Sequence, residues 1–254
     1  MNLPDLKDKI IFITGSDKGL GKAFVKNFAE NKAEIISCSR KQDVEYEKFC
    51  EELRNKHNIK IHNYYFDLEN FDEMSKNIKS ILINFSKIDV LINNAGINLT
   101  SLIEMTSLEK LKKIYEVNFF SVYFITQKVL KLLKKSEEPS IVNISSSASI
   151  ENNIGRFAYA SSKQILNSFT KTLSKEVGRY KIRVNSIAPG LTNTKMMKKS
   201  TTDKNIEETV KRIPIARVAE VDEIAQLVLF LSSNNSSYIN GQIISIDGGL
   251  SESL

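Results

Sequence analysis

Cysteine and long hydrophobic runs are both scarce in this chain of 254 residues. Its two cysteines, Cys38 and Cys50, have no framework of further cysteines around them, so we expect reduced thiols and a cytoplasmic protein. The longest apolar runs, 10–13 and 227–231, are far too short to span a bilayer, so we expect no membrane-spanning segment. The first nine residues include two aspartates and no long apolar stretch, which is not the pattern of a secretory signal.

The overall composition is that of an ordinary globular protein. Hydrophobic residues make up 41% of the chain and charged residues 26%, proportions that exclude wholesale disorder and low-complexity architecture. The net charge of +6 could attract a polyanion. However, 29 of the 36 basic residues are lysines spread over the whole chain beside 30 acids, whereas nucleic-acid binders more often cluster arginines and aromatic residues. We therefore expect no nucleic-acid partner, which a salt-dependent binding assay would test.

Strands and helices are expected to alternate along the whole chain. Short apolar runs predict strands over 10–14, 34–39, 60–66, 89–93, 140–145, 182–188 and 242–246. Stretches with helical periodicity lie between them, over 20–31, 44–56, 71–85, 108–135, 159–177 and 221–231. This alternation predicts βαβ units. The expected fold class is α/β, a single domain over 1–254 with a Rossmann-type doubly wound parallel sheet of about seven strands and helices on both faces.

One segment, 190–219, does not fit this alternation. It is long, polar, rich in lysine and threonine, and it contains Met196 and Met197. Long loops in compact domains are usually functional or mobile. We expect a mobile substrate loop that closes over the substrate and excludes water from the reaction.

Three glycines follow the first expected strand. Gly15, Gly19 and Gly21 form a GxxxGxG pattern between this strand and the next helix. Glycine lets the backbone turn tightly and approach a pyrophosphate, while the helix start behind it offers free N–H groups and the positive end of its dipole. The pattern favours a dinucleotide site, and turn chemistry alone is the alternative interpretation.

Tyr159 and Lys163 are four residues apart in an expected helix, so their side chains share one face. A phenol needs a lowered pKa to exchange a proton near neutral pH, and a nearby ammonium group lowers it. The pair suits general acid–base catalysis, although tyrosine and lysine are common on helices and the pair alone says little. Ser146 lies at the end of the fifth expected strand, where a hydroxyl can bind a substrate oxygen.

Together these patterns resemble the short-chain dehydrogenase/reductase family. The motifs stand in the family's order: TGxxxGxG at 14–21, NNAG at 93–96, YxxxK at 159–163, Pro-Gly at 189–190, and closing motifs at 240–242 and 247–249. The resemblance covers the whole chain. It implies an oxidoreductase that uses NADP(H), transfers hydride between nicotinamide and a carbonyl or secondary alcohol, and needs no metal ion.

The resemblance also implies the site residues. The catalytic set would be Ser146, Tyr159, Lys163 and Asn118, the last holding a water that extends a proton relay from the lysine. Three consecutive serines, 145–147, leave the register open, and the family's usual separation from the tyrosine favours Ser146. The cofactor would be bound by Gly15, Ser16, Lys18, Gly19, Leu20, Gly21, Arg40, Asp67, Leu68, Asn94, Ala95, Gly96, Tyr159, Lys163, Pro189, Gly190, Thr192 and Thr194.

The choice between NAD and NADP depends on the end of the second expected strand. An acidic residue there binds the ribose hydroxyls and selects NAD, but this chain has Arg40 and no acid before Asp43. Arg40 can pair with a 2′-phosphate, and Lys18 can add a second cation. In the resembling family, basic residues at these two places go with NADP. A solvated charge at the strand end is the alternative for Arg40.

Two other functions on related folds fit the sequence less well. A non-catalytic NADP-binding regulator would usually lack the tyrosine or the lysine, and this chain has both. A sugar-nucleotide epimerase or dehydratase of the longer relatives would have TGxxGxxG, whereas this chain has the other glycine spacing.

The substrate stays open at this stage. The commonest relatives of this length reduce 3-oxoacyl groups on acyl carrier protein, and others act on sugars, steroids or small ketones. A basic docking patch beside the substrate entrance could come from Lys134, Lys135, Arg179 and Lys181. Against the carrier, Glu137, Glu138 and Tyr180 stand where acyl-carrier reductases often have arginine, and segment 97–99 lacks their usual Arg-Asp.

We also expect a homotetramer or a homodimer. The expected helices 108–135 and 159–177 have more apolar positions than one sheet face should bury, namely Val122, Ile125, Val129, Leu133, Leu166, Phe169 and Leu173. In the resembling family these two helices pair between subunits.

Overall fold

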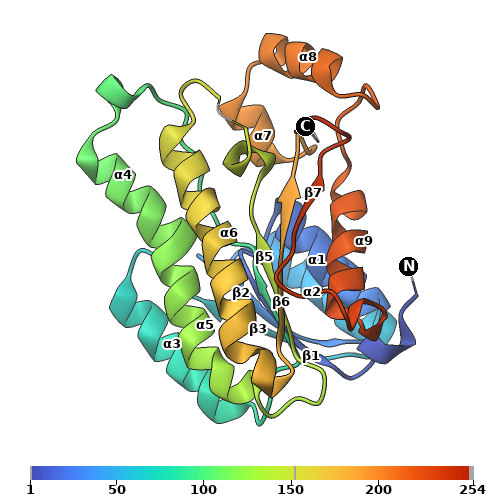
Figure 1. The fold of residues 1–254 in the computed structure, drawn as a ribbon. Coiled ribbons are helices and arrows are strands. Elements are labelled where there is room, and N and C mark those ends of the chain that lie inside the picture. Colours follow the sequence, from blue (N-terminus) through green and yellow to red (C-terminus); the bar gives the residue numbers. More distant parts are fainter. Residues whose placement is uncertain (1, 152, 252–254) are drawn as a thin grey trace.

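A single parallel sheet organises the protein, seen in a computed structural model that describes residues 2–151 and 153–251. The strands are β1 (Ile10–Thr14), β2 (Glu34–Ser39), β3 (Ile61–Tyr65), β4 (Val90–Asn93), β5 (Ser140–Ile144), β6 (Arg183–Pro189) and β7 (Ile243–Ile246). Their order in the sheet is β3-β2-β1-β4-β5-β6-β7, and every adjacent pair is parallel (Figure 1). The order reverses between β1 and β4, which is where open α/β sheets bind ligands.

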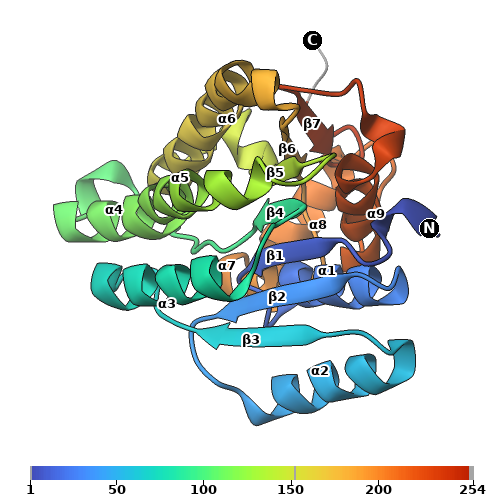
Figure 2. The same ribbon diagram turned by 90° about the horizontal axis from the view of Figure 1, so that it is seen from below.

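Helices cover both faces of the sheet (Figure 2). One face is covered by α1 (Gly19–Glu30), α2 (Val44–His57) and α9 (Val221–Ser232). The other is covered by α3 (Phe71–Asn84), α5 (Ser121–Leu133) and α6 (Phe157–Val177), with α4 (Leu108–Tyr115) continuing beyond the sheet. The predicted doubly wound α/β fold is therefore confirmed.

The central strands are apolar along their whole length because both of their faces are buried. In β1, Ile11 and Ile13 pack into the core beneath α1 and α9, whereas Phe12 points into the core beneath α3 and α5. All three side chains are completely buried. Alternate residues of a strand point to opposite faces, so this short run serves both cores at once.

The predicted helix over 108–135 is interrupted, which corrects the sequence interpretation. The α4 helix ends at Tyr115, a π-helical segment spans Glu116–Phe120, and α5 begins at Ser121. A π turn accommodates an extra residue without breaking the helix, and such turns occur frequently at functional sites. The buried Asn118 lies within this segment.

The segment 190–219 is not an unbroken loop, as its composition suggested. It contains α7 (Lys195–Ser200) and α8 (Asp203–Arg212). Thr194 and Thr202 cap these two helices, because their hydroxyls accept the Met197 and Asn205 N–H groups at 3.1 and 3.3 Å. All ten residues of α8 are at least partly exposed, and its only two apolar residues, Ile206 and Val210, are half-buried. The remaining short helices are Pro4–Leu6, Ile103–Met105, Ser147–Ser149, Gly178–Tyr180 and Asn234–Ser236.

The apolar residues expected to form a surplus stripe lie mostly inside the chain. Six of them are at most 6% exposed: Val122, Ile125, Val129, Leu133, Leu166 and Leu173. Phe169 is half-buried against the same core. The exposed apolar side chains of α4 to α6 and of the π-helical segment are others, namely Leu108, Phe120, Tyr123, Phe157 and Ile165.

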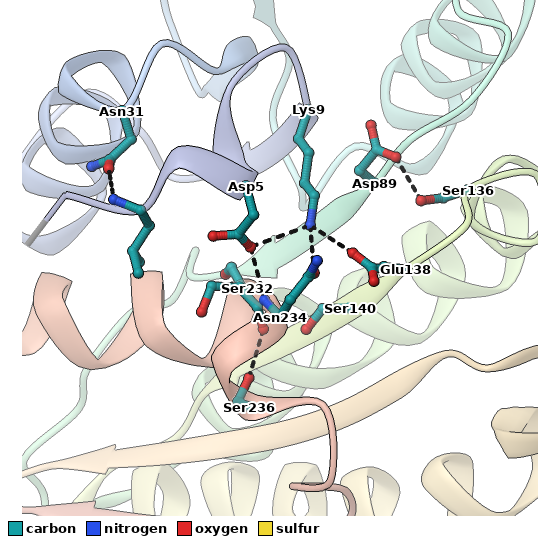
Figure 3. A network of polar contacts seen from close by, with 12 residues as sticks. Asp5, Lys9, Asn31, Asp89, Ser136, Glu138, Ser140, Ser232, Asn234 and Ser236 are labelled. Carbon is teal, nitrogen blue, oxygen red and sulfur yellow. Dashed lines mark hydrogen bonds and ion pairs between the residues drawn. The ribbon is translucent and has the colours of Figure 1, made fainter.

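A polar network closes the amino-terminal edge of the sheet (Figure 3). The Lys9 ammonium donates to Asn234 Oδ1 at 3.0 Å and lies 3.7 Å from Asp5 and 3.6 Å from Glu138. The Asn234 N–H in turn donates to Asp5 at 2.8 Å. These contacts join the start of the chain to the segments before β5 and after α9, at the edge opposite the glycine turn.

Two further properties of the described residues bear on function. No helix among residues 2–151 and 153–251 is long and apolar enough to cross a membrane. Cys38 and Cys50 are both buried free thiols, as expected from the cysteine count.

Candidate active site

The predicted site residues lie at the carboxyl-terminal edge of the sheet. The glycine turn follows β1, the NNAG motif ends β4, Ser146 follows β5, and Pro189 ends β6. Because β1, β4, β5 and β6 are adjacent parallel strands, segments far apart in the sequence meet at this edge.

Two positions of the glycine turn admit no side chain. Gly15 has φ +64°, and a Cβ there would stand 2.8 Å from Ala95 Cα. A Cβ on Gly21 would stand 1.9 Å from the Gly15 carbonyl oxygen. No side chain caps the start of α1, since Lys18 at its N-cap makes no such bond, so the first N–H groups of α1 remain suited to an anion.

Asn94 joins the glycine turn to the end of β4. Its Nδ2 donates to the carbonyl oxygens of Thr14 and Gly15, each at 2.9 Å. The Thr14 hydroxyl accepts the N–H groups of Asn94 and Ala95, each at 3.1 Å. Asn94 therefore fixes the shape of the turn through its side chain.

The loop after β6 reaches the same turn. Thr194 lies 3.7 Å from where a Cβ on Gly19 would stand, and a Cβ on Gly190 would stand 2.6 Å from Asp247. Thr192 is buried, and its hydroxyl donates to the Gly190 carbonyl at 3.0 Å. The structure thus brings the predicted residues after β6 close to those after β1.

A cavity of about 660 Å³ opens where β2 and β3 end, and it is lined by Arg40, Lys41, Asp67, Glu69, Asn70, Phe71, Asp72 and Glu73. Arg40 and Lys41 supply two positive charges there, and Lys41 was missed by sequence reasoning although it directly follows Arg40. Lys18 lies 3.7 Å from Asp17 in an exposed ion pair, which partly offsets its charge. Leu68 packs against the core beneath α3 and does not line the cavity.

The structure distinguishes the three consecutive serines. Ser145 is buried, and its hydroxyl bonds to Ser149 at 3.1 Å and to the Lys163 carbonyl at 3.2 Å. Ser147 is also buried. Ser146 is partly exposed, and its hydroxyl lies close enough to the Tyr159 phenol to lower the pKa of that phenol. Of the three serines, Ser146 is the one placed beside the tyrosine.

Opposing influences act on the pKa of Tyr159. Burial raises it, while the hydrogen bond with Ser146 and the positive charge of Arg156 lower it, and the net shift is upward. Arg156 was missed by sequence reasoning, although a cation one helical turn before the tyrosine was a visible signal. Its guanidinium donates to Asn98 Oδ1 at 2.8 Å and to the Thr100 hydroxyl at 3.1 Å.

Lys163 is 3% exposed, and its ammonium donates to the Ile144 carbonyl at 2.7 Å. Burial lowers the pKa of Lys163 to about 8. A Cβ on Gly96 would stand 3.2 Å from the Lys163 Nζ, so the NNAG segment passes directly beside the ammonium.

Asn118 pins the segment that follows NNAG. Its Oδ1 accepts the Ile97 N–H at 2.8 Å, and its Nδ2 donates to the Ile97 carbonyl at 3.0 Å and to the Ser162 hydroxyl at 3.0 Å. The π-helical segment presents Asn118 to both partners. In this arrangement the side chain connects the end of β4 to α6, the helix of Tyr159.

The expected docking patch is not beside this site. Lys134 and Lys135 follow α5, and Arg179 and Lys181 follow α6, while the chain then enters the amino-terminal ends of β5 and β6. Tyr159 lies at the carboxyl-terminal end of β5, next to Ser146. Within this chain the patch and the site are at opposite edges of the sheet, which corrects the sequence interpretation.

Among the residues that the structure describes, no three His, Cys, Asp or Glu side chains are grouped closely enough to bind a metal ion.

Known proteins with the same organisation match nearly the whole chain. The family profile described as "Enoyl-(Acyl carrier protein) reductase" matches residues 15–251. The 3-oxoacyl-[acyl-carrier-protein] reductase FabG of Chlamydia muridarum is 36% identical over 245 residues, which are 96% of this chain and 98% of that protein. The 3alpha-hydroxysteroid dehydrogenase of Mediterraneibacter gnavus is 34% identical over 244 residues, 96% of this chain and 97% of that one.

A solved structure agrees with these relatives. A 3-oxoacyl-[acyl-carrier protein] reductase with bound NAD from Brucella melitensis has a TM-score of 0.87 and 27% identity, covering 99% of this chain and 94% of its own. The sheet order, the glycine turn and the whole-chain similarity to these relatives agree with one another. The chain therefore belongs to the short-chain dehydrogenase/reductase family, whose members are oxidoreductases acting on carbonyl and CH–OH groups.

Proposed function

We propose that this protein is an NADP(H)-dependent oxidoreductase that transfers hydride between the nicotinamide and a carbonyl or secondary alcohol. The observation that supports this best is the convergence of Ser146, Tyr159 and Lys163 beside the NNAG segment. The glycine turn supports the same proposal, because a Cβ at Gly15 or Gly21 would clash with Ala95 or with the Gly15 carbonyl, so the tight turn requires glycine there. When bound, the nicotinamide cofactor supplies or accepts the hydride.

The residues of this chain then have separate tasks. The hydroxyls of Ser146 and Tyr159 hold the substrate oxygen, and Tyr159 donates the proton that this oxygen gains during reduction. The Lys163 ammonium would hold the nicotinamide ribose when the cofactor is bound. Asn118 acts through position, since its amide group holds the Ile97 backbone and the Ser162 hydroxyl in place.

The raised pKa of Tyr159 favours the reductive direction. A phenol with a pKa above its usual value is protonated at neutral pH and can donate its proton to a developing alkoxide. Oxidation of an alcohol needs the phenolate, which the positive charge of Arg156 and the Ser146 hydrogen bond favour.

NADPH affinity is expected to fall as the pH rises through about 8. Lys163 has its pKa lowered to about 8, so its amine becomes neutral above that pH and its hydrogen bond to the ribose loses the contribution of charge. We expect a loss of about threefold to tenfold. Titrating NADPH on both sides of this pH, with nicotinamide emission as the signal, measures it. An inflection that persists in Lys163→Met would assign the titration to another group.

Reduction of a 3-oxoacyl group on acyl carrier protein is the leading candidate for the specific reaction. The similarity to a FabG protein supports it, and the similarity to a hydroxysteroid dehydrogenase supports a free small-molecule ketone as the second candidate. The basic residues expected to dock the carrier lie at the far edge of the sheet, and Glu137 and Glu138 separate them along the chain.

Turnover of NADPH with a carrier-bound 3-oxoacyl thioester, a 3-oxosteroid, an aldose and a small ketone tests these candidates. Carrier activity that falls steeply with added salt would support the acyl-carrier reaction, because charge steering is screened beyond ~10 Å at 0.1 M. Far better reduction of a free ketone, steroid or sugar would exclude it and leave the general reductase.

We also propose that the protein is a homotetramer or a homodimer assembled through α4 to α6. Leu108, Phe120 and Tyr123 are 65%, 50% and 47% exposed there. Contact with another subunit would bury this apolar surface. Light scattering that gives the mass of a single chain at micromolar concentration would refute this.

A further inference from the structure

Three buried hydroxyl groups form a chain behind the cofactor cradle. Ser16 Oγ lies 2.8 Å from Ser37 Oγ, which lies 2.8 Å from the Tyr46 hydroxyl. Each of the three residues is at most 2% exposed. Ser16 belongs to the glycine turn, Ser37 to β2 and Tyr46 to α2, so the chain joins three elements. Neither Ser37 nor Tyr46 belongs to the site described above.

The direction of each hydrogen bond in the hydroxyl chain follows from the bond at the Ser16 end. Ser16 Oγ donates its proton to the Cys38 carbonyl oxygen at 2.9 Å. A serine hydroxyl has one proton, so Ser37 must donate to Ser16, and Tyr46 must donate to Ser37. The Cys38 carbonyl also accepts the Ser16 N–H at 3.0 Å. Hydrogen bonds aligned in one direction inside a protein strengthen one another.

The chain of hydroxyls fixes both ends of the loop that contains Arg40. The hydroxyl chain ends at the carbonyl of Cys38, which lies in β2 two residues before Arg40. Tyr46, where the chain starts, lies in the first turn of α2, and its N–H donates to Asp43 Oδ1 at 2.9 Å. Ser16 is part of the turn proposed to bind the pyrophosphate. The loop and the turn are thereby tied to each other by buried side chains.

Packing alone does not explain these residues. A buried tyrosine needs a partner for its hydroxyl, whereas phenylalanine fills almost the same volume without one. Burial and the nearby Cys50 thiol raise the pKa of Tyr46, so the phenol is protonated at neutral pH and can donate its proton. The same reasoning applies to Ser37, which follows two buried isoleucines in β2 and is 1% exposed.

We propose that Tyr46 is a positioning residue for the adenosine half of the cofactor, which sets the spacing between the glycine turn and the Arg40 loop through Ser37 and Ser16. This inference rests on the NADP(H) function proposed above. It assigns Tyr46 to the affinity for the two phosphate groups at that end of the cofactor, and not to the chemistry at Tyr159.

The Tyr46→Phe variant tests the proposal because it keeps the ring and removes the hydroxyl. We expect the Kd values of NADPH and of adenosine 2′,5′-bisphosphate to rise by the same factor, about threefold to tenfold. The kcat at saturating NADPH stays within about twofold, since the nicotinamide end is untouched. Tyr64→Phe is the matched control. It removes a hydroxyl on β3 that accepts a hydrogen bond from Asn84 Nδ2 at 3.2 Å and is not part of the hydroxyl chain. This variant should leave both Kd values unchanged.

A double-mutant cycle completes the test. Ser37→Ala should weaken NADPH binding as Tyr46→Phe does, and the double variant should lose little more than either single one, because both changes break the same chain. A lowered Tm with unchanged Kd values in Tyr46→Phe would overturn the proposal and leave a structural role. The proposal would also be overturned if the increases in Kd of the two single variants multiplied in the double variant. If the wild-type protein bound neither NADPH nor the bisphosphate, the proposed function itself would fail as well.

Discussion

The Tyr159→Phe variant is expected to lower kcat by about 100- to 10,000-fold. The phenol lies beside the Ser146 hydroxyl, which lowers its pKa. Without its hydroxyl the substrate oxygen loses its proton donor, and only water can protonate it. NADPH affinity should stay within about twofold, because the ring remains and the glycine turn is unchanged.

Steady-state turnover and NADPH titration of the same protein sample measure both quantities. Tyr238→Phe is a suitable control, since that side chain is fully exposed at the opposite edge of the sheet. Retention of more than about a tenth of the wild-type kcat by Tyr159→Phe would show that another group donates the proton.

Arg40→Asp is expected to reverse the cofactor preference. The wild-type protein should prefer NADPH, because Arg40 and Lys41 line the cavity where β2 ends. Removal of a charge-assisted hydrogen bond and addition of a negative charge beside the 2′-phosphate should weaken NADPH binding by about 100-fold. The new carboxylate can accept hydrogen bonds from the ribose hydroxyls, so NADH binding should be retained or improved.

The acidic residues of the same cavity make this test necessary. Asp67, Glu69, Asp72 and Glu73 also line it, and a related Brucella melitensis protein was solved with NAD. The chain contains no tryptophan, so nicotinamide emission reports binding directly. Lys135→Asp makes the same change of net charge at the opposite edge of the sheet and should leave the preference unchanged. Equal wild-type affinities for the two cofactors would contradict the assignment of Arg40.

The sheet was predictable because its strands are buried on both faces. The expected bounds of β1 and β2 match the structure, and the other strands differ by one residue at one end or at both ends. A continuous apolar run between turn residues leaves little freedom of interpretation. The helix α8 was missed for the opposite reason, since none of its residues is buried and only Ile206 and Val210 among them are apolar.

The errors at the site and on the surface have physical causes too. Val122, Ile125 and Val129 have the spacing of an exposed stripe, but spacing does not show which side of a helix meets the sheet, and all three are buried. The basic docking patch was placed by sequence proximity alone. A helix that leads into the start of a parallel strand ends at the edge of the sheet opposite the ligand site. The lysines after α5 and Arg179 after α6 therefore lie far from Tyr159.

The buried hydroxyl chain was invisible for a different reason. Ser37 is a polar residue in a strand, and Tyr46 is an aromatic residue in a polar helix. Neither is unusual when it is considered alone. Their meaning depends on Ser16, which is 21 residues from Ser37 and meets it only in the folded protein. A signal was nevertheless present, because a serine in the middle of an apolar strand needs a partner.

Transfer of deuterium from NADPH labelled at both C4 positions of the nicotinamide tests the central claim most directly. The wild-type protein, given the carbonyl compound that it reduces best, should place one deuterium on the carbinol carbon of the product, as read by mass spectrometry. Tyr159→Phe should bind the labelled cofactor and form almost no labelled product. Absence of label from the product of every carbonyl class tested, or equal labelling by Tyr159→Phe, would contradict hydride transfer with Tyr159 as the proton donor.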